Sequence, residues 1–392
     1  MPLYSKFDRK SYFYPDMPKN YQITQFDLPF CVDGHLVLSG KGFSGSDLGD
    51  KKIGITRIHM EEDVAKSTHF GDFSGIDYNR AGVPLMEVVS EPDMSTADDA
   101  YAYLTSLREI MQYADISNCD MEKGQMRCDV NISLKLHDAT EFGTKIEIKN
   151  LNSRKAVHAS IEYEIVRQAE LLDKGETLQQ ETRGWNSDLE ETYLMRVKEN
   201  ADDYRYFPEP DLMPFELTEE EIEGYRNNLP ELPKDMRARF VKDYGLTEYD
   251  AQVLTAEIDL AQYFNTGAKL TKSPKIFANW VISELLRELS DANIAITETK
   301  VTPGNLAAMV DLIDKGTISG KIAKTVFAEM IKTGDTPEKI VKEKGLVQVT
   351  DEGAIEEFVD KAIADNTPQV EQYKSGKTEV LQYFVGQVMK LS

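Results

Sequence analysis

The chain has 392 residues, enough for two or three domains, and its hydrophobic content of 41% supports folded cores. A net charge of −23 argues against a mainly nucleic-acid-binding surface, and no apolar run approaches the roughly 20 residues of a membrane span. The N-terminal residues lack the apolar core of a signal peptide, and the three cysteines lack metal-ligand spacing. We therefore expect a cytoplasmic protein with reduced thiols, no structural zinc and no membrane partner.

The first part of the chain, to about residue 216, is predicted to be mainly β-structure with inserted helices. Strand-like residues 35–38 and 53–58 flank the sequence GKGFSG at 40–45. This matches the dinucleotide-binding motif in letters alone, because that motif must leave a strand and open a helix. We expect a hairpin loop here, and the sequence contains no GxxxxGK[ST] motif that would form a P-loop.

An acidic cluster lies in the apolar, strand-like stretches 57–63 and 79–93, and it includes Glu61, Glu62 and Glu87. Carboxylates in such strands need a physical reason, because charged side chains are rarely buried without partners. Metal and phosphate binding is one reason, a charge-compensated structural network is another, and the spacing leaves both open.

Three basic side chains lie within or beside the acidic cluster. His59 can serve there as a metal ligand, an acid/base group or an ion-pair partner. Arg57 and Arg80 suit the phosphates of a bound nucleotide, because guanidinium groups pair well with phosphate oxygens. These two arginines are our predicted cofactor-binding residues.

A helix is predicted to begin at Ser95, which forms a capping box with Asp98. Leu104, Leu107 and Met111 follow at helical spacing and form its apolar face. A second helix is predicted from about residue 153 to 172. The three prolines of residues 205–214 predict an ordered loop.

Residues 126–136 alternate between apolar and polar side chains, and residues 145–149 resume the pattern after a short connection. The period of two predicts a pair of antiparallel strands. If their apolar residues share one face, Asp129 and Glu147 must share the other, with Arg127 and Lys145. Carboxylates among cations suit a site for Mg²⁺ and phosphate, although a solvated sheet face explains the pattern equally well.

Beyond about residue 217 the pattern changes to short amphipathic helices. Thr302 and Pro303 predict a helix start, and apolar stripes follow at 306–313 and 322–330, the second ending at Gly334. Between residues 315 and 344 there are seven lysines and four acids, a local excess of three positive charges. Such a basic face can meet a phosphate backbone locally, and Lys321 and Lys324 are the predicted nucleic-acid contacts on it.

Several segments resemble one family, the B subunits of tRNA-dependent amidotransferases. The resemblance covers nearly the whole chain in family order. The segments that carry it are 7–25 (FDRKSYFYPDMPKNYQITQ), 59–63 (HMEED), 79–93 (NRAGVPLMEVVSEPD), 126–133 (MRCDVNIS), 145–153 (KIEIKNLNS), 203–212 (DYRYFPEPDL), 316–324 (GTISGKIAK) and 344–348 (KGLVQ).

The resemblance implies an α+β protein with three parts. These are a β-rich, cradle-like catalytic domain at 1–216, an all-helical domain at 217–342, and a partial, helical, tRNA-binding tail domain at 343–392. It also implies that the chain lacks the family's N-terminal strand with its Glu-Val-His sequence and ends before the tail domain finishes.

The resemblance further implies a reaction. The B subunit uses ATP and Mg²⁺ to phosphorylate the side-chain carboxyl of misacylated Glu-tRNA(Gln) or Asp-tRNA(Asn). Ammonia released from glutamine by the A subunit, an amidase, then displaces the phosphate, and a C subunit completes the heterotrimer. An alternative is a non-catalytic, tRNA-binding scaffold, because the missing strand contributes to the family's metal site.

Carried over by position, Glu62, Asp129 and Glu147 are the predicted metal or phosphate-site residues, together with Glu61. Arg127 and Lys145 are the predicted catalytic cations, which would stabilise charge on the transferred phosphoryl group.

Overall fold

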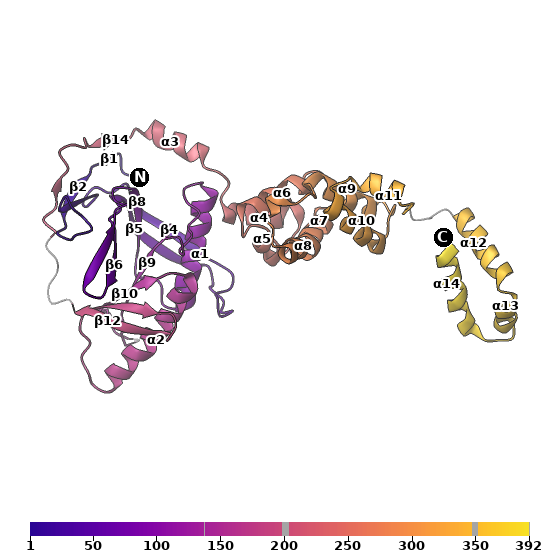
Figure 1. The fold of residues 1–392 in the computed structure, drawn as a ribbon, viewed down its shortest axis with the longest axis horizontal. Coiled ribbons are helices and arrows are strands. Elements are labelled where there is room, and N and C mark those ends of the chain that lie inside the picture. The colour runs from indigo at the N-terminus through magenta and orange to yellow at the C-terminus, as the bar shows by residue number, and fades with distance from the viewer. Residues whose placement is uncertain (137, 198–203, 347–351, 392) are drawn as a thin grey trace. The chain divides into compact units, whose positions relative to one another are not determined.

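The computed structural model describes residues 1–136, 138–197, 204–346 and 352–391. Residues 203 and 347–348, which belong to segments that carry the family resemblance, lie outside these ranges. Contacts divide the chain into two compact units, Met1–Pro233 and Lys234–Ser392. The described strands all belong to the first unit and the second is helical, which confirms the predicted α+β class (Figure 1).

The described strands of the first unit form five small sheets, in the orders β1-β14, β12-β11-β10-β9, β13-β2-β3, β4-β5-β8 and β6-β7. The sheets β4-β5-β8 and β12-β11-β10-β9 carry most of the predicted site residues. The strands are β1 (Tyr4–Ser5), β2 (Asp8–Ser11), β3 (Tyr21–Thr24), β4 (Cys31–Leu38), β5 (Lys51–Glu62), β6 (Lys66–Phe70), β7 (Phe73–Asp77), β8 (Pro84–Ser90), β9 (Cys128–Ile132), β10 (Ile146–Leu151), β11 (Glu181–Asn186), β12 (Glu191–Val197), β13 (Phe207–Pro208) and β14 (Phe215–Glu216).

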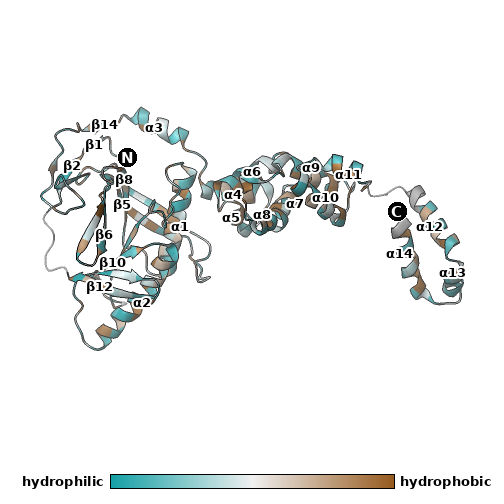
Figure 2. Cartoon of the chain, in the orientation of Figure 1, coloured by the Kyte–Doolittle hydropathy of each residue, from teal (hydrophilic) through white to brown (hydrophobic). Residues whose placement is uncertain are grey.

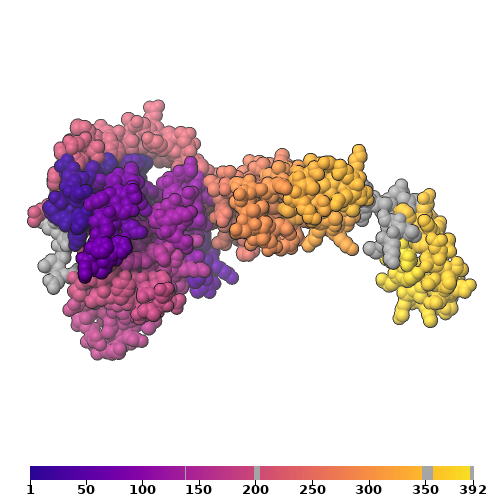
Figure 3. All heavy atoms as spheres, viewed as in Figure 1, coloured from indigo at the N-terminus to yellow at the C-terminus, as the bar shows by residue number. Residues whose placement is uncertain are grey.

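Two short strands near the N-terminus pair with strands from the end of the first unit. Strand β1 pairs with β14, and β2 pairs with β13, all antiparallel. In Figure 3 the indigo N-terminal atoms accordingly lie against pink atoms from the end of this unit. The pairing fixes the β13-β2-β3 sheet, whose strand β3 lies beside β5.

Helices α1 (Ala97–Tyr113) and α2 (Arg154–Asp173) pack together over the core of this unit. The core joins Ile53 of β5 and Ile148 of β10 to the predicted face of α1, where Leu104, Leu107 and Met111 are buried. Helix α2 begins at its Ser153 cap, as predicted. A further helix, α3 (Glu219–Asn228), follows β14.

The start of α1 differs from the prediction by one residue. The N-cap is Thr96, and Asp99 completes the capping box. Ser95 and Asp98 have the same spacing, but the carboxylate of Asp98 instead accepts hydrogen bonds from two serines of the β4–β5 loop and contacts His158. The predicted Ser95–Asp98 box is therefore wrong, because a tertiary contact engages its acidic member.

The GKGFSG sequence lies in the loop between β4 and β5, as predicted. The loop's serines, Ser44 and Ser46, hold it against α1 through Asp98. Gly42 lies so close that a Cβ atom there would be 2.5 Å from Oδ2 of Asp98. Glycine is therefore required for close packing of the loop on α1, and the pattern has no dinucleotide-binding geometry.

Strands β9 and β10 form the predicted antiparallel pair, with Asn131 opposite Glu147. The strand predicted over 126–136 is only Cys128–Ile132 long. Leu136 is 77% exposed, so the apolar alternation beyond Ile132 has no core to face. Residues 133–136 form a loop because no partner strand continues there.

The second unit consists of short helices, as predicted, and the Thr302 cap and the Gly334 stop are confirmed. Thr302 caps α9, and Ser319 caps α10, which ends at Gly334 in the left-handed conformation. The elements are α4 (Pro233–Tyr244), α5 (Glu248–Leu254), α6 (Ile258–Ala268), α7 (Pro274–Asn279), the π-helix η1 (Trp280–Leu285), α8 (Leu286–Ala292), the 3-10 helix η2 (Ile296–Glu298), α9 (Pro303–Asp314), α10 (Gly320–Thr333) and α11 (Pro337–Glu343).

The last described elements are α12 (Glu352–Asp365), α13 (Thr367–Lys374), η3 (Thr378–Val380) and α14 (Leu381–Leu391), with α12 packed against α14. Apolar and polar residues alternate around the helices of this unit in Figure 2. No helix in the described ranges is long and apolar enough to cross a lipid bilayer.

Candidate functional site

A β-bulge in β5 decides which way the acidic cluster points. Ile55 lies opposite Ser90 of β8, but Arg57 lies opposite Val89, so β5 has one extra residue between them. An extra residue exchanges the two faces of a strand. Ile58 therefore packs against the core with Val88, while His59 and Glu61 point to the other face.

This other face brings together His59, Glu61 and Glu87. His59 lies directly opposite Glu87 in the β5–β8 pair. Nε2 of His59 is 3.5 Å from Oε1 of Glu61 and 3.6 Å from Oε2 of Glu87. Ligand atoms of the three residues lie within 4.8 Å of one another, and among the described residues this is the one group of this kind that could hold a metal ion.

The environment keeps Glu61 charged. Thr24 donates to Oε1 at 2.8 Å and Gln22 to Oε2 at 3.3 Å, both from β3. Burial alone would raise the pKa of Glu61, but the His59 bond, the charge of Lys10 and the Thr24 bond outweigh it and lower the pKa. An ionised carboxylate beside a second carboxylate is a suitable ligand for a divalent cation.

An aromatic wall lies beside the group. The rings of Phe26 and Tyr206 stack with centroids 4.1 Å apart. Burial, followed by the negative charge of Glu61, raises the pKa of Tyr206 to about 12, so its hydroxyl is protonated at neutral pH. Arg57, a predicted nucleotide contact, donates to the carbonyl of Phe26 at 3.2 Å. Sequence reasoning missed Tyr206, because residues 205–214 show a loop pattern without chemical specificity.

Glu62 is not part of the group, although it adjoins Glu61. Its Oε1 accepts from the backbone N–H of Ile23 at 2.7 Å and lies 2.5 Å from Nζ of Lys19. Successive residues of a strand point to opposite faces, which separates these neighbouring carboxylates. The assignment of Glu62 as a metal ligand stays a prediction.

Asp129 and Glu147 share one face of the β9–β10 pair, as the alternation predicts. Lys149 joins them, with Nζ 2.7 Å from Oδ2 of Asp129 and 3.3 Å from Oε1 of Glu147. Burial alone would lower the pKa of Lys149, but the bond with Asp129 raises it. Neither carboxylate belongs to the His59 group, so their metal roles stay predictions, as does the catalytic role of Lys145, just before β10.

Asp63 connects two arginines that the sequence assigned separately. Nη2 of Arg80 is 2.8 Å from Oδ2 of Asp63, and Nη2 of Arg127 is 2.7 Å from Oδ1. Arg80 also donates to the carbonyl of Gly124 at 2.7 Å. We did not predict Asp63 as a site residue, although it ends the HMEED sequence.

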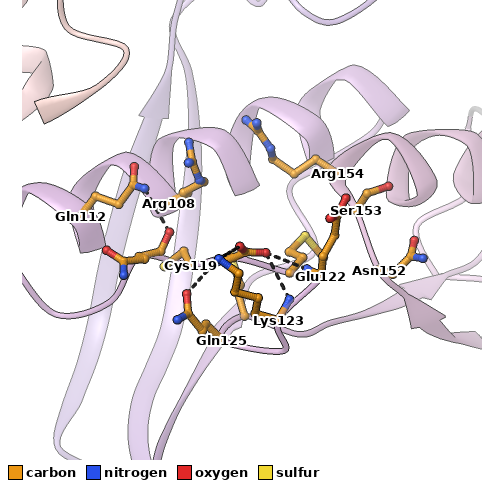
Figure 4. A pocket seen from close by; sticks show the side chains of 13 residues that line it. Arg108, Gln112, Cys119, Glu122, Lys123, Gln125, Asn152, Ser153 and Arg154 are labelled. Atoms are coloured by element: carbon orange, nitrogen blue, oxygen red, sulfur yellow. Dashed lines mark hydrogen bonds and ion pairs between the residues drawn. The ribbon is translucent and has the colours of Figure 1, made fainter. Parts of the chain in front are cut away.

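A cavity of about 400 Å³ lies between α1, the loop at 118–126 and the start of α2. Arg108 and Arg154 line it from the helices, and Lys123 lines it from the loop (Figure 4). Asp120 holds the loop's shape, because its carboxylate accepts from the backbone N–H groups of Glu122 and Lys123. Gly124, which Arg80 contacts, belongs to the same loop.

The family model described as the GatB/GatE catalytic domain matches residues 1–223, and the one described as the GatB domain matches 262–392. The B subunit of the aspartyl/glutamyl-tRNA(Asn/Gln) amidotransferase of Carboxydothermus hydrogenoformans is 54% identical over 99% of this chain and 80% of that relative. The chain belongs to this family of amidotransferase B subunits. Those of Caldanaerobacter subterraneus and Persephonella marina are 51% and 50% identical, over 99% and 98% of this chain and 80% of each relative.

Membership in the B-subunit family confirms the resemblance seen in the sequence. The catalytic-domain match includes His59, Glu61, Asp63 and Glu87. The second match includes Lys321 and Lys324 of α10, the predicted nucleic-acid contacts, which the resemblance assigns to tRNA. Of these, Lys324 forms an ion pair of 2.9 Å with Glu284 and remains 65% exposed.

Proposed function

We propose that this chain activates the side-chain carboxyl of Glu-tRNA(Gln) or Asp-tRNA(Asn) with ATP and Mg²⁺, as the B subunit of an amidotransferase. A partner A subunit would release ammonia from glutamine, and a C subunit would complete the complex. The observation that carries the proposal is the His59, Glu61 and Glu87 group, within the segment that matches a catalytic-domain family.

The group fits Mg²⁺ by its chemistry. Mg²⁺ is usually held by one or two protein carboxylates, with phosphate oxygens and water as the remaining ligands. Glu61 and Glu87 supply the carboxylates, and His59 lies between them. Its Nδ1 is buried and has no hydrogen-bond partner among the described residues, which is an unusual state for a buried polar atom and fits a site that is completed by a ligand. A bound Mg²⁺ would neutralise charge on the phosphate oxygens during transfer.

The proposed reaction explains why ATP is needed. A carboxylate resists attack by ammonia, because an oxide ion is a very poor leaving group. A carboxylate oxygen of the substrate attacks the γ-phosphorus of ATP, the bond to the β-phosphate oxygen breaks, and ADP leaves. Ammonia then forms the new bond to the acyl carbon, phosphate leaves, and a proton is lost to give the amide.

The protein's own groups would orient the reactants. Arg57 lies at the aromatic wall beside the carboxylates and can contact phosphate oxygens. The ring of Tyr206, whose hydroxyl stays protonated at neutral pH, offers a flat, uncharged surface that helps to exclude water from the site.

Glu61→Gln and Glu87→Gln test the proposal, since each removes one anionic ligand with little change in shape. The measurement is ADP release that depends on Glu-tRNA(Gln) and Mg²⁺, in a complex reconstituted with A and C subunits. We expect each variant to lower the rate about tenfold or more, with partial recovery at high Mg²⁺. Glu191→Gln, an exposed carboxylate on β12, is the control and should match the wild type.

Two results would contradict the proposal. If both variants keep the wild-type rate, Glu61 and Glu87 are not ligands of a catalytic metal ion. Absence of tRNA-dependent ADP release in the wild type would instead favour the non-catalytic, tRNA-binding scaffold.

A further inference from the structure

Two arginines share a single buried carboxylate at the end of β5. The side chain of Asp63 is 5% exposed, whereas Arg80 and Arg127 are 47% and 58% exposed. One carboxylate neutralises one guanidinium, so the trio keeps one net positive charge at the surface. Two guanidinium groups held side by side repel each other, and an anion that contacts both relieves this repulsion.

Asp63, which holds both arginines, directly follows the strand that carries His59 and Glu61. Backbone bonds from Asp63 to Val83 and from Gly82 to Asp63 continue the β5–β8 pairing beyond the last residue of β5. Alternate residues of a strand share a face, so Asp63 follows Glu61 on the same face at roughly 7 Å along the strand. A carboxylate group that suits a cation therefore adjoins a guanidinium pair that suits an anion. A metal–nucleotide complex presents these two charges side by side.

Arg80 has a second fixed contact, which makes its placement specific. Nη1 donates to the carbonyl of Gly124 at 2.7 Å. Gly124 has φ +65°, and a Cβ atom there would be 2.9 Å from Nη1 of Arg80. Glycine thus permits both the left-handed backbone and the approach of the guanidinium.

We propose that Asp63 is a positioning residue that fixes Arg80 and Arg127 for contact with the phosphate oxygens of ATP during phosphoryl transfer. The inference rests on the proposed function, because it takes ATP as the ligand. In this proposal Asp63 touches no substrate; it acts through the two arginines, whose side chains stay about half exposed and can therefore reach a ligand. The role differs from a plain structural ion pair, which needs only one cation for one carboxylate.

Asp63→Asn tests the role in the reconstituted complex with ATP and Glu-tRNA(Gln). The variant keeps an oxygen that can accept from Arg127 and from the backbone N–H of Val64, but it loses the charge and one acceptor. Both arginines remain, so attraction of ATP persists while orientation is lost. We expect kcat for ADP release to fall about tenfold or more, with KM for ATP within about threefold of the wild type.

Asp99→Asn is the matched control. Asp99 is also buried, with a side chain 6% exposed, and pairs with Lys51 at 2.7 Å, but it caps α1 away from the arginines. We expect a lower melting temperature and a kcat within about twofold of the wild type. An Asp63→Asn enzyme that keeps its kcat, or an Asp99→Asn enzyme that loses as much, overturns the inference.

Gly124→Ala keeps the test decisive if Asp63→Asn does not fold. It displaces Arg80 while Asp63 and Arg127 stay, so kcat should fall about threefold or more, and an unchanged kcat contradicts the inference. If the wild type releases no ADP, the proposed function fails and the inference falls with it. If the wild type releases ADP and the Asp63→Asn and Gly124→Ala variants keep its kcat, the proposed function stands and this inference alone fails.

Discussion

Among single residues, the direction of a side chain separates neighbours that are chemically alike. Glu61 belongs to the site: it accepts a hydrogen bond from Thr24 and lies beside His59. Glu62, in contrast, is held by Lys19 and by the backbone of Ile23. Both are glutamates with buried surroundings. Only the orientation set by the strand puts one of them beside a second carboxylate that faces the same site.

We expect Glu61→Gln and Glu62→Gln to differ in their dependence on Mg²⁺. The first removes a proposed ligand and should raise the half-saturating Mg²⁺ concentration for ADP release about tenfold or more, while the second should change it less than about threefold. Glu62→Gln should instead lower the melting temperature, because Lys19 loses its partner. Equal Mg²⁺ dependence in the two variants would favour Glu62 as a ligand, as the sequence suggested.

Among the helices and strands, a buried carboxylate fastens α2 to the neighbouring sheet. Glu164 has a fully buried side chain and accepts from Arg167 at 2.9 Å within α2. It lies 3.2 Å from Nε of Arg183 on β11 and accepts from Thr192 on β12. Burial alone would raise the pKa of Glu164, but the bonds from Arg167 and Thr192 outweigh it and lower the pKa.

Glu164→Gln is expected to destabilise the first unit by about 3 kcal/mol at pH 7, because two arginines lose a buried partner. A lowered folded-state pKa stabilises the protein above the unfolded value of about 4.3, and this contribution is lost as pH falls through the folded pKa. The difference from the wild type should therefore shrink in acid. Urea unfolding over a range of pH, followed by Trp185 fluorescence in a Trp280→Phe background, measures this difference in the free energy of unfolding.

The control for this change is Glu170→Gln on the same helix. Glu170 is 66% exposed and lies 4.0 Å from Lys174, so its loss should change stability little at any pH. A destabilisation by Glu164→Gln that stays constant down to pH 3 would contradict the proposed linkage.

Over the molecule as a whole, an acidic protein carries a locally basic segment. The net charge is −23, yet Lys321 and Lys324 lie exposed three residues apart on α10, on one side of that helix. Repulsion by the rest of the protein would limit non-specific binding of nucleic acid. Local lysines would then act only where a tRNA is already placed.

We expect Lys321→Glu with Lys324→Glu to weaken tRNA binding and to flatten its dependence on salt. Each lost phosphate contact should reduce the slope of log K against log salt by about 0.9. Lys41→Glu with Lys174→Glu changes the net charge equally at exposed positions of the first unit and serves as the control. Filter binding over a salt series measures tRNA binding by both double variants. If their slopes of log K against log salt are identical, Lys321 and Lys324 are not tRNA contacts.

Features that depend on neighbours along the chain could be predicted before the fold was known. The helix start near Ser153, the cap at Thr302, the hairpin loop at 40–45 and the shared face of Asp129 and Glu147 follow from local sequence signals and from the fixed periods of helices and strands. The family followed as well, because the order of motifs is a property of the amino-acid sequence.

How distant segments meet became clear from the fold alone. One extra residue in β5 exchanges its faces, and strand spacing cannot show where a bulge lies. The pairing of His59 with Glu87 depends on the register between two strands, which no local pattern states. The contacts of Asp63 with Arg80 and Arg127 likewise need three segments to converge. The sequence marked His59, Glu61 and Glu87 as members of an acidic cluster, but their grouping required the tertiary structure, because grouping is set by contacts between segments far apart in the chain.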